Sequence, residues 1–209
     1  IVVEDMPKNV DGFKKNWHPS HMRDQFQRNA LERGYKDFND EDLIMISDID
    51  EIPNPKKISE FKIQNKYACF IQKNFQAKIN RLNITEEKWP GTKICQKKNL
   101  KSPQWLRDIK TKKRKIWQIY KEKEPQIILD GGWHFSFLKD YNLIKKKIKS
   151  FAHQEFNNEN FTDIKQIEKR INSGTDIFER KYEYKKINLD SQFPDYILRN
   201  KIKFKEWIL

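Results

Sequence analysis

LIMISDIDEIP, residues 43–53, is the stretch that decides the fold. It opens with four consecutive apolar residues, and three carboxylates follow within four positions, at Asp48, Asp50 and Glu51. An unbroken apolar run between acidic and turn residues is typical of a buried strand in a parallel sheet. Ligands of open α/β sheets bind beyond the carboxyl ends of the strands. The stretch therefore predicts an α/β fold, with a mostly parallel central sheet flanked by helices and a ligand site at the end of this strand.

The crowding of the three carboxylates has two interpretations. Ionising all of these neighbouring carboxylates is costly unless a positive partner is present, and a hard divalent cation with oxygen ligands would supply one. Such an ion commonly sits between protein carboxylates and the phosphates of a substrate. The structural alternative is that Asp48 caps a turn while Asp50 and Glu51 begin a solvated loop before Pro53.

Composition indicates a folded protein with a strongly basic surface. Aromatic residues make up 13% of the 209 residues, which is too many for a disordered chain. The net charge of +13 favours a polyanionic partner such as nucleic acid, an anionic membrane or a phosphorylated substrate. Lysines are spread along the whole chain, so a solvated basic surface explains most of this charge, and a nucleic-acid partner is disfavoured.

One basic and aromatic region, residues 98–123, keeps the nucleic-acid alternative open. Trp105 and Trp117 flank the lysine-rich run at residues 110–115. An amphipathic helix with a solvated basic face explains the same pattern, and we favour that interpretation.

The two cysteines and the hydropathy bear on compartment and organisation. Cys69 and Cys95 have the neighbours of neither a zinc site nor a redox pair, so we interpret them as buried thiols. No apolar run reaches the length of a membrane span. These features favour a cytoplasmic protein if the source is bacterial or viral, whereas a eukaryotic source would indicate the Golgi lumen.

The absence of a repeat or linker predicts a single domain over residues 1–209. The oligomeric state is not indicated.

A second motif, DGGWHFS at residues 130–136, follows a short apolar strand predicted at residues 126–129. The two glycines predict a tight turn, or a close approach of backbone or ligand, immediately before Trp133 and His134. We expect this turn to bring His134 toward Asp48 and Asp50, with a ring nitrogen and a carboxylate oxygen about 3–5 Å apart if both bind one ion. The alternative is a packed histidine.

Further elements complete the prediction. A helix is expected over about residues 20–33 and carries Arg28 and Asn29, and a strand is expected at residues 66–75. The adjoining Pro90 and Gly91 predict a turn at residues 89–92.

In their order and spacing these motifs resemble those of glycosyltransferase family 17, and Asp-x-Asp after an apolar strand is an arrangement seen in nucleotide-sugar transferases. The resemblance covers nearly the whole chain. The matching pieces are Arg23-Asp24, Gln27-Arg28-Asn29, residues 47–53, Trp89-Pro90-Gly91-Thr92, residues 132–136 and residues 150–153.

The resemblance implies a GT-A type nucleotide-sugar transferase fold, here lacking its N-terminal strand. It also implies a UDP-sugar donor, most often UDP-N-acetylglucosamine, a glycan acceptor, and an inverting transfer. A divalent metal, manganese or else magnesium, would assist that transfer.

The expected site residues fall into three groups. The metal ligands are expected among Asp48, Asp50 and His134. Donor contacts are expected from Arg28, Asn29, Asp48 and Trp133. The base that takes the acceptor proton is left open among Glu155, Asp130 and His153, with a preference for Glu155.

Two alternatives to a transferase remain at this point. Carboxylates and a histidine around a metal also suit a metal-dependent phosphohydrolase or nuclease. A nucleic-acid-binding module built on residues 98–123 would explain the charge, but it leaves the acidic strand end and the Gly-Gly-Trp-His motif without a role. Trp89 and Trp133 are candidates for stacking on a sugar, although tryptophan more often packs in a core.

Overall fold

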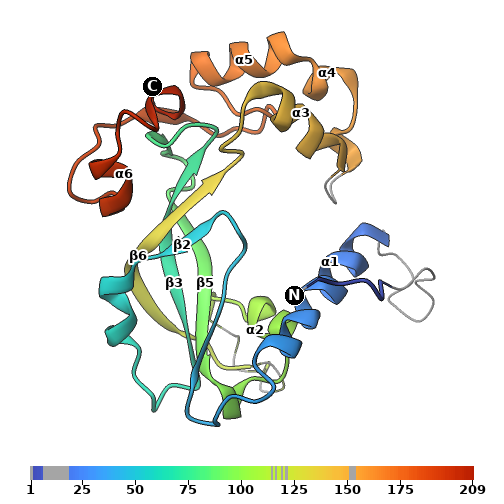
Figure 1. Ribbon diagram of the computed structural model, residues 1–209, viewed down its shortest axis with the longest axis vertical. Helices are drawn as coiled ribbons and strands as arrows, with labels where there is room; N and C mark the ends of the chain where they lie inside the picture. The colour runs from blue at the N-terminus through green and yellow to red at the C-terminus, as the bar shows by residue number, and fades with distance from the viewer. Residues whose placement is uncertain are drawn as a thin grey trace. The chain divides into compact units, whose positions relative to one another are not determined.

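The computed structural model describes residues 2–6, 19–113, 115, 117–118, 120, 122–150 and 154–209. These residues form a mixed α/β fold with two compact units (Figure 1). Unit 1 comprises Ile1–Ile46, Ser59–Cys69 and Thr92–Ile128, and unit 2 comprises Ser47–Ile58, Phe70–Gly91 and Leu129–Leu209. Three long strands, β3, β5 and β6, contribute residues to both units.

The helices and strands have the following bounds. The strands are β1 (Leu43–Ile46), β2 (Glu51–Pro53), β3 (Tyr67–Gln76), β4 (Arg81–Asn83), β5 (Lys88–Gln96), β6 (Gln126–Ser136) and β7 (Tyr184–Lys186). The α-helices are α1 (Pro19–Asn29), α2 (Pro103–Asp108), α3 (Tyr141–Ser150), α4 (Glu159–Thr162), α5 (Ile164–Ser173) and α6 (Asp195–Arg199). The 3-10 helices are η1 (Ala30–Gly34), η2 (Pro55–Glu60), η3 (Lys97–Asn99), η4 (Gln154–Phe156) and η5 (Lys205–Trp207).

The strand pairing differs from the parallel sheet that the sequence predicts. The described strands follow the order β1-β5-β3-β4-β7, and β6 pairs with β2 and β3. The pairs β1–β5, β2–β6, β3–β4 and β4–β7 are all antiparallel. A mostly parallel sheet is therefore not confirmed.

The strand β1 is placed differently from the central position that was predicted for it. It stands at the end of the described strand order, where it pairs antiparallel with β5. Ile44 and Ile46 are buried, but Leu43 is 44% exposed. Only alternate residues of the apolar run reach the core. The unbroken run predicted a strand buried on both faces, but β1 is well buried on one face only.

Both predicted turns are strands instead. Residues 89–92 lie inside β5, and β6 continues without a turn through Gly131 and Gly132. Gly132 has a φ of +140°, and a Cβ built there would lie 2.1 Å from the carbonyl oxygen of Ile52. The glycine therefore serves the close approach of β2 to β6 rather than a reversal of the chain.

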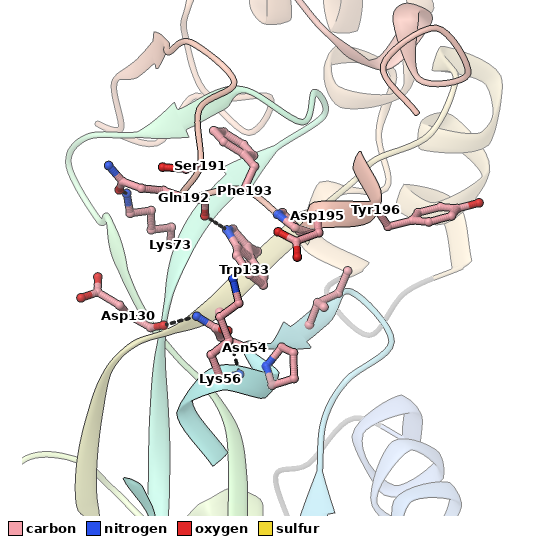
Figure 2. Close-up of a pocket in the computed structure, with 14 residues that line it drawn as sticks. Asn54, Lys56, Lys73, Asp130, Trp133, Ser191, Gln192, Phe193, Asp195 and Tyr196 are labelled. Carbon is pink, nitrogen blue, oxygen red and sulfur yellow. Dashed lines mark hydrogen bonds between the residues drawn. The ribbon is translucent and has the colours of Figure 1, made fainter. Parts of the chain in front are cut away.

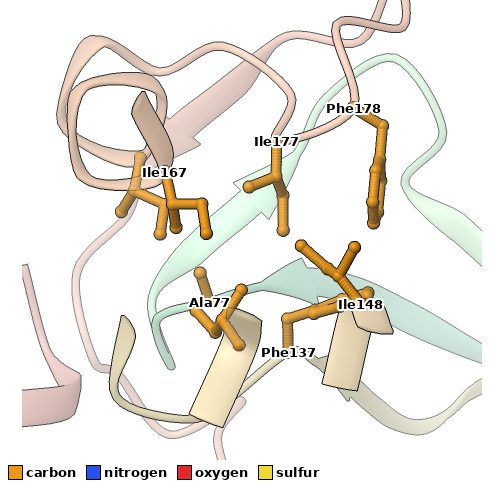
Figure 3. Packing of buried hydrophobic residues seen from close by; sticks show 8 residues of the cluster. Ala77, Phe137, Ile148, Ile167, Ile177 and Phe178 are labelled. Atoms are coloured by element: carbon orange, nitrogen blue, oxygen red, sulfur yellow. The ribbon is translucent and has the colours of Figure 1, made fainter. Parts of the chain in front are cut away.

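Each unit has its own hydrophobic core. In unit 1, Ile44 and Ile46 of β1 pack in one cluster with Leu106 of α2. In unit 2, α3 and α5 pack against each other, and their isoleucines meet Ala77 and Phe137 (Figure 3). A second cluster of unit 2 joins the strand residues Phe75, Trp133 and Phe135 to Phe193 and Ile197 near the carboxyl end of the chain.

A buried arginine ties the helices of unit 2 to β4. Arg81 is 1% exposed, and its guanidinium donates to Gln76 Oε1 and to the carbonyl oxygens of Ile171 and Thr175 at 3.1, 3.2 and 2.5 Å. Burial lowers the pKa of Arg81 to about 10. The contacts with carbonyl oxygens offset the cost of burying this cation, so they fix where α5 ends.

Replacing Gly132 by alanine tests whether β2 and β6 approach as closely as described. Gly132→Ala should lower the free energy of unfolding by about 3 kcal/mol or more, because the new Cβ meets backbone and the φ is strained. Gly174→Ala is the matched control. Gly174 follows α5 with a φ of +77°, and its nearest contact would be 3.1 Å, so it should lose only about 1 kcal/mol. Equal losses in urea denaturation of the two variants would contradict the close approach.

Candidate functional site

The pairing of β2 with β6 builds the candidate site within unit 2. Glu51 lies opposite His134, Ile52 opposite Trp133, and Pro53 opposite Gly132. Opposed residues of an antiparallel pair share one face of the sheet, and successive residues alternate between faces. Glu51 and His134 therefore share one face, while Ile52 and Trp133 share the other.

Glu51 points into the protein rather than into a solvated loop. It is 4% exposed. Its Oε1 accepts the indole N–H of Trp89 at 2.9 Å, and its Oε2 accepts the backbone N–H of Asp48 at 3.2 Å. Two donors to a buried carboxylate stabilise its charge and fix the loop that carries Asp48.

His134 is held in one orientation by its neighbours. Its Nδ1 lies 3.0 Å from Oδ1 of Asn74, and the Asn74 amide is itself oriented because its Nδ2 donates to the Glu86 carbonyl at 3.0 Å. An amide oxygen only accepts, so Nδ1 carries the proton. Trp89 stacks on the ring with 4.2 Å between centroids and 14° between planes. The second nitrogen, Nε2, is thereby directed away from Asn74.

Asp50 lies between this imidazole and a lysine. Its Oδ1 is 3.8 Å from His134 Nε2, and its Oδ2 accepts a hydrogen bond of 3.3 Å from Nζ of Lys147 on α3. The backbone carbonyl of Asp50 accepts the N–H of Phe135 at 2.8 Å, so the loop before β2 is anchored to β6. The separation of 3.8 Å falls within the range predicted for His134 and an acid, although the chain does not turn at the glycines.

The donor set at Asp50 and His134 fits part of a metal site. A neutral imidazole whose Nδ1–H is bound to an amide oxygen presents a lone pair on Nε2, which is the usual state of a metal-binding histidine. The carboxylate of Asp50 is the second donor. In the part of the chain that the structure describes, no group of three or more His, Cys, Asp or Glu side chains could hold an ion. Protein ligands would therefore have to be supplemented by substrate phosphates or water, as is common for magnesium.

Other predicted residues lie elsewhere. Arg28 and Asn29 end α1 in unit 1, where Arg28 donates to Gln104 Oε1 at 2.5 Å and Asn29 Oδ1 accepts the Gln104 N–H at 3.0 Å. These bonds join α1 to α2. A contact of either residue with the donor stays a prediction.

Asp130 and Trp133 line a separate pocket of unit 2 with a volume of about 530 Å³ (Figure 2). Asp48, Asp50 and His134 are not among its lining residues. The structure thus separates Trp133 from His134, because successive residues of β6 face opposite sides of the β2–β6 pair.

The candidate bases are not brought together with Asp50 by any described contact. Glu155 is exposed on η4, and its carbonyl accepts the Asn158 side-chain amide at 3.2 Å. His153 lies outside the described residues. The roles of Glu155, His153 and Asp130 as base stay predictions.

Sequence reasoning missed two residues of the site. Asn74 belongs to a row of buried polar residues on β3, together with Gln72 and Gln76, and polar residues at alternate positions of a buried strand are a usable signal. Lys147 stands between the buried Ile144 and Ile148 of α3, so it flanks the inward face of an otherwise basic helix.

Comparison with protein families matches residues 6–205 to glycosyltransferase family 17. The match spans residues of both units and includes every element that forms the site. The protein is therefore a sugar-transferring enzyme. The chain belongs to glycosyltransferase family 17.

Searches of curated proteins and of solved structures found no match. Among the described residues, no helix is both long and apolar enough to cross a membrane.

Trp89→Phe tests the bond that joins Trp89 to the buried Glu51. Phenylalanine keeps an aromatic ring over His134 but leaves one carboxylate oxygen without its indole donor. The free energy of unfolding should fall by about 1.5–3 kcal/mol, the range for hydrogen bonds to charged groups. Trp117→Phe, at a position 71% exposed, should change it by less than about 0.5 kcal/mol. A Trp89→Phe protein as stable as this control would contradict the assigned role of Glu51.

Proposed function

We propose that this chain transfers N-acetylglucosamine from a UDP-sugar donor to a glycan acceptor, with inversion at the anomeric carbon and with the help of a divalent metal, manganese in preference to magnesium. Family membership supports the class of reaction. The observation that supports this use of the site is the pair formed by Asp50 and His134, with Nε2 3.8 Å from Oδ1. A GT-A type fold is part of the same proposal.

In this proposal Asp50, Asp48 and His134 face the diphosphate of the donor. Asp50 and His134 Nε2 would hold the ion, and Asp48 would contribute directly, through water or through the donor ribose. The ion, when bound, neutralises negative charge on the UDP leaving group. The surrounding residues keep the pair in place: Asn74 fixes the tautomer of His134, and Glu51 fixes the Asp48 loop.

Lys147 contributes a second positive charge to the same carboxylate. Its ammonium donates to Asp50 Oδ2, so Asp50 has a cationic partner in the protein itself. Lys147 is partly exposed, with 31% of its side-chain surface accessible, and its Nζ lies over the ring of Phe137, 4.6 Å from the centroid. A short movement of the side chain would let the ammonium pair with a donor phosphate instead.

The acceptor hydroxyl attacks the anomeric carbon while a base takes its proton, and the bond from that carbon to the diphosphate oxygen breaks. Attack from the face opposite UDP gives inversion. Glu155 is the preferred base, with Asp130 and His153 as alternatives. Arg28 and Asn29 remain proposed donor contacts, and Trp133 is the proposed contact for a sugar on the opposite face of the β2–β6 pair.

Asp50→Asn is the test of this proposal. The variant removes the negative charge of the Asp50 carboxylate, which lies beside His134 and Lys147. Release of UDP from UDP-N-acetylglucosamine with manganese should therefore fall by roughly 100-fold or more. Asp37→Asn, at an exposed position of unit 1, is the matched control and should retain full turnover. Thermal unfolding of each variant shows whether the fold is kept. A folded Asp50→Asn protein with full activity would refute the assigned role of Asp50.

A parallel assay with phosphodiesters and with RNA separates the transferase from the hydrolase alternative. UDP release with no cleavage of these substrates is the expected result. Metal-dependent phosphoester cleavage without turnover of the UDP-sugar would replace the proposed function by a phosphohydrolase.

A further inference from the structure

The pocket of about 530 Å³ in unit 2 is separate from the Asp50–His134 site. Its floor includes Ile52 and Trp133, which face the opposite side of the β2–β6 pair from Glu51 and His134. The volume lies inside the roughly 300–1,000 Å³ typical of small-molecule sites. The two sites can therefore be occupied by different ligands or by different parts of one ligand.

The walls of the pocket are fixed by hydrogen bonds before any ligand binds. The indole N–H of Trp133 donates to the Gln192 carbonyl at 2.8 Å, and the Lys73 ammonium donates to the Gln192 side chain (Figure 2). Asn54 bonds the Gly131 carbonyl at 2.8 Å through its backbone and the Asp130 carbonyl at 3.3 Å through its amide. The Trp133 bond joins Gln192 to β6, the Lys73 bond joins Gln192 to β3, and the Asn54 bonds join the segment after β2 to β6, so binding costs little reorganisation.

The charges of the lining favour a neutral ligand. Lys56 and Lys73 are balanced by Asp130 and Asp195, so the pocket has no net attraction for a diphosphate. Asp130, Asp195 and Ser191 are exposed, so their oxygens are accessible to hydroxyl groups of a ligand.

An aromatic side chain is available at the rim. Tyr196 is 58% exposed and lines the pocket. Its ring is steadied by an edge contact with Phe204, with centroids 5.9 Å apart, and its hydroxyl accepts a hydrogen bond of 3.0 Å from Lys203. A steadied, exposed ring beside carboxylates and a hydroxyl offers both a surface for the C–H face of a sugar and partners for its hydroxyls.

We propose that this pocket binds a neutral sugar unit of the glycan acceptor, one that is not itself the site of transfer. The proposal rests on the proposed function for the identity of the glycan as acceptor. Because Trp133 is 8% exposed and its N–H is engaged, Tyr196 is the ring that contacts the sugar, and Trp133 forms the floor.

Binding of neutral disaccharides to the whole chain tests the pocket without any donor. N,N′-diacetylchitobiose and mannobiose are titrated by saturation-transfer NMR, with inorganic pyrophosphate as an anionic comparison. At least one disaccharide should bind, and Tyr196→Ala should weaken its binding about tenfold or more. Tyr120→Ala, at a position 78% exposed and outside the pocket lining, should leave disaccharide binding unchanged. Tyr196→Ala, Tyr120→Ala and wild type are compared only when all three unfold at the same temperature.

The proposal would be overturned by the absence of disaccharide binding, or by disaccharide binding that Tyr196→Ala and Tyr120→Ala affect equally. Pyrophosphate binding that Tyr196→Ala and Lys56→Ala weaken would also overturn it, by showing an anion site instead. UDP release from the donor by wild-type protein is measured separately and without acceptor. Absence of UDP release would contradict the proposed function. Disaccharide binding that depends on Tyr196 would still support a sugar site in this pocket.

Discussion

The buried carboxylate of Glu51 is the constraint on which the site depends. A charged group that is 4% exposed must be hydrogen-bonded, and the backbone N–H of Asp48 and the indole N–H of Trp89 both donate to Glu51. The first donor sets the loop that presents Asp48 and Asp50. The second sets Trp89, whose ring covers His134. One carboxylate thus links the acidic loop to the imidazole on β6, while Gly132 allows β2 to lie close enough for the link.

The sequence predicted individual strands better than their partners. The apolar run at residues 43–46 forms β1, and the strand expected at residues 66–75 forms β3 at Tyr67–Gln76. Apolar periodicity reports how much of a strand is buried but not which strand lies beside it, so the antiparallel partner of β1 was not predictable. Gly131 and Gly132 correctly indicated a close approach of two backbone segments. A glycine with an unusual φ can occur in a tight turn or within a strand, so the pattern did not distinguish the two, and the structure has a strand.

In the site too, some contacts were predictable from the sequence and others were not. The approach of His134 to Asp50 was expected from two motifs that lie far apart in the sequence, and the geometry agrees with it at 3.8 Å. Lys147 was hidden because it is one of several lysines on α3, and only its position beside the buried Ile148 distinguishes it. Trp89 was considered as a sugar contact, but its indole is engaged with Glu51. Such contacts depend on which strands are neighbours, which the sequence alone does not specify.

Paramagnetic NMR with manganese and UDP tests the central claim most directly, namely that Asp50 and His134 form the donor and metal site. The histidine ring signals are followed during a manganese titration, and His21 on α1 is the internal reference. The account predicts that the His134 signals broaden at lower manganese concentration than those of His21, and that Asp50→Asn removes this difference. Equal broadening of both histidines, or selective broadening that survives in Asp50→Asn, would contradict it.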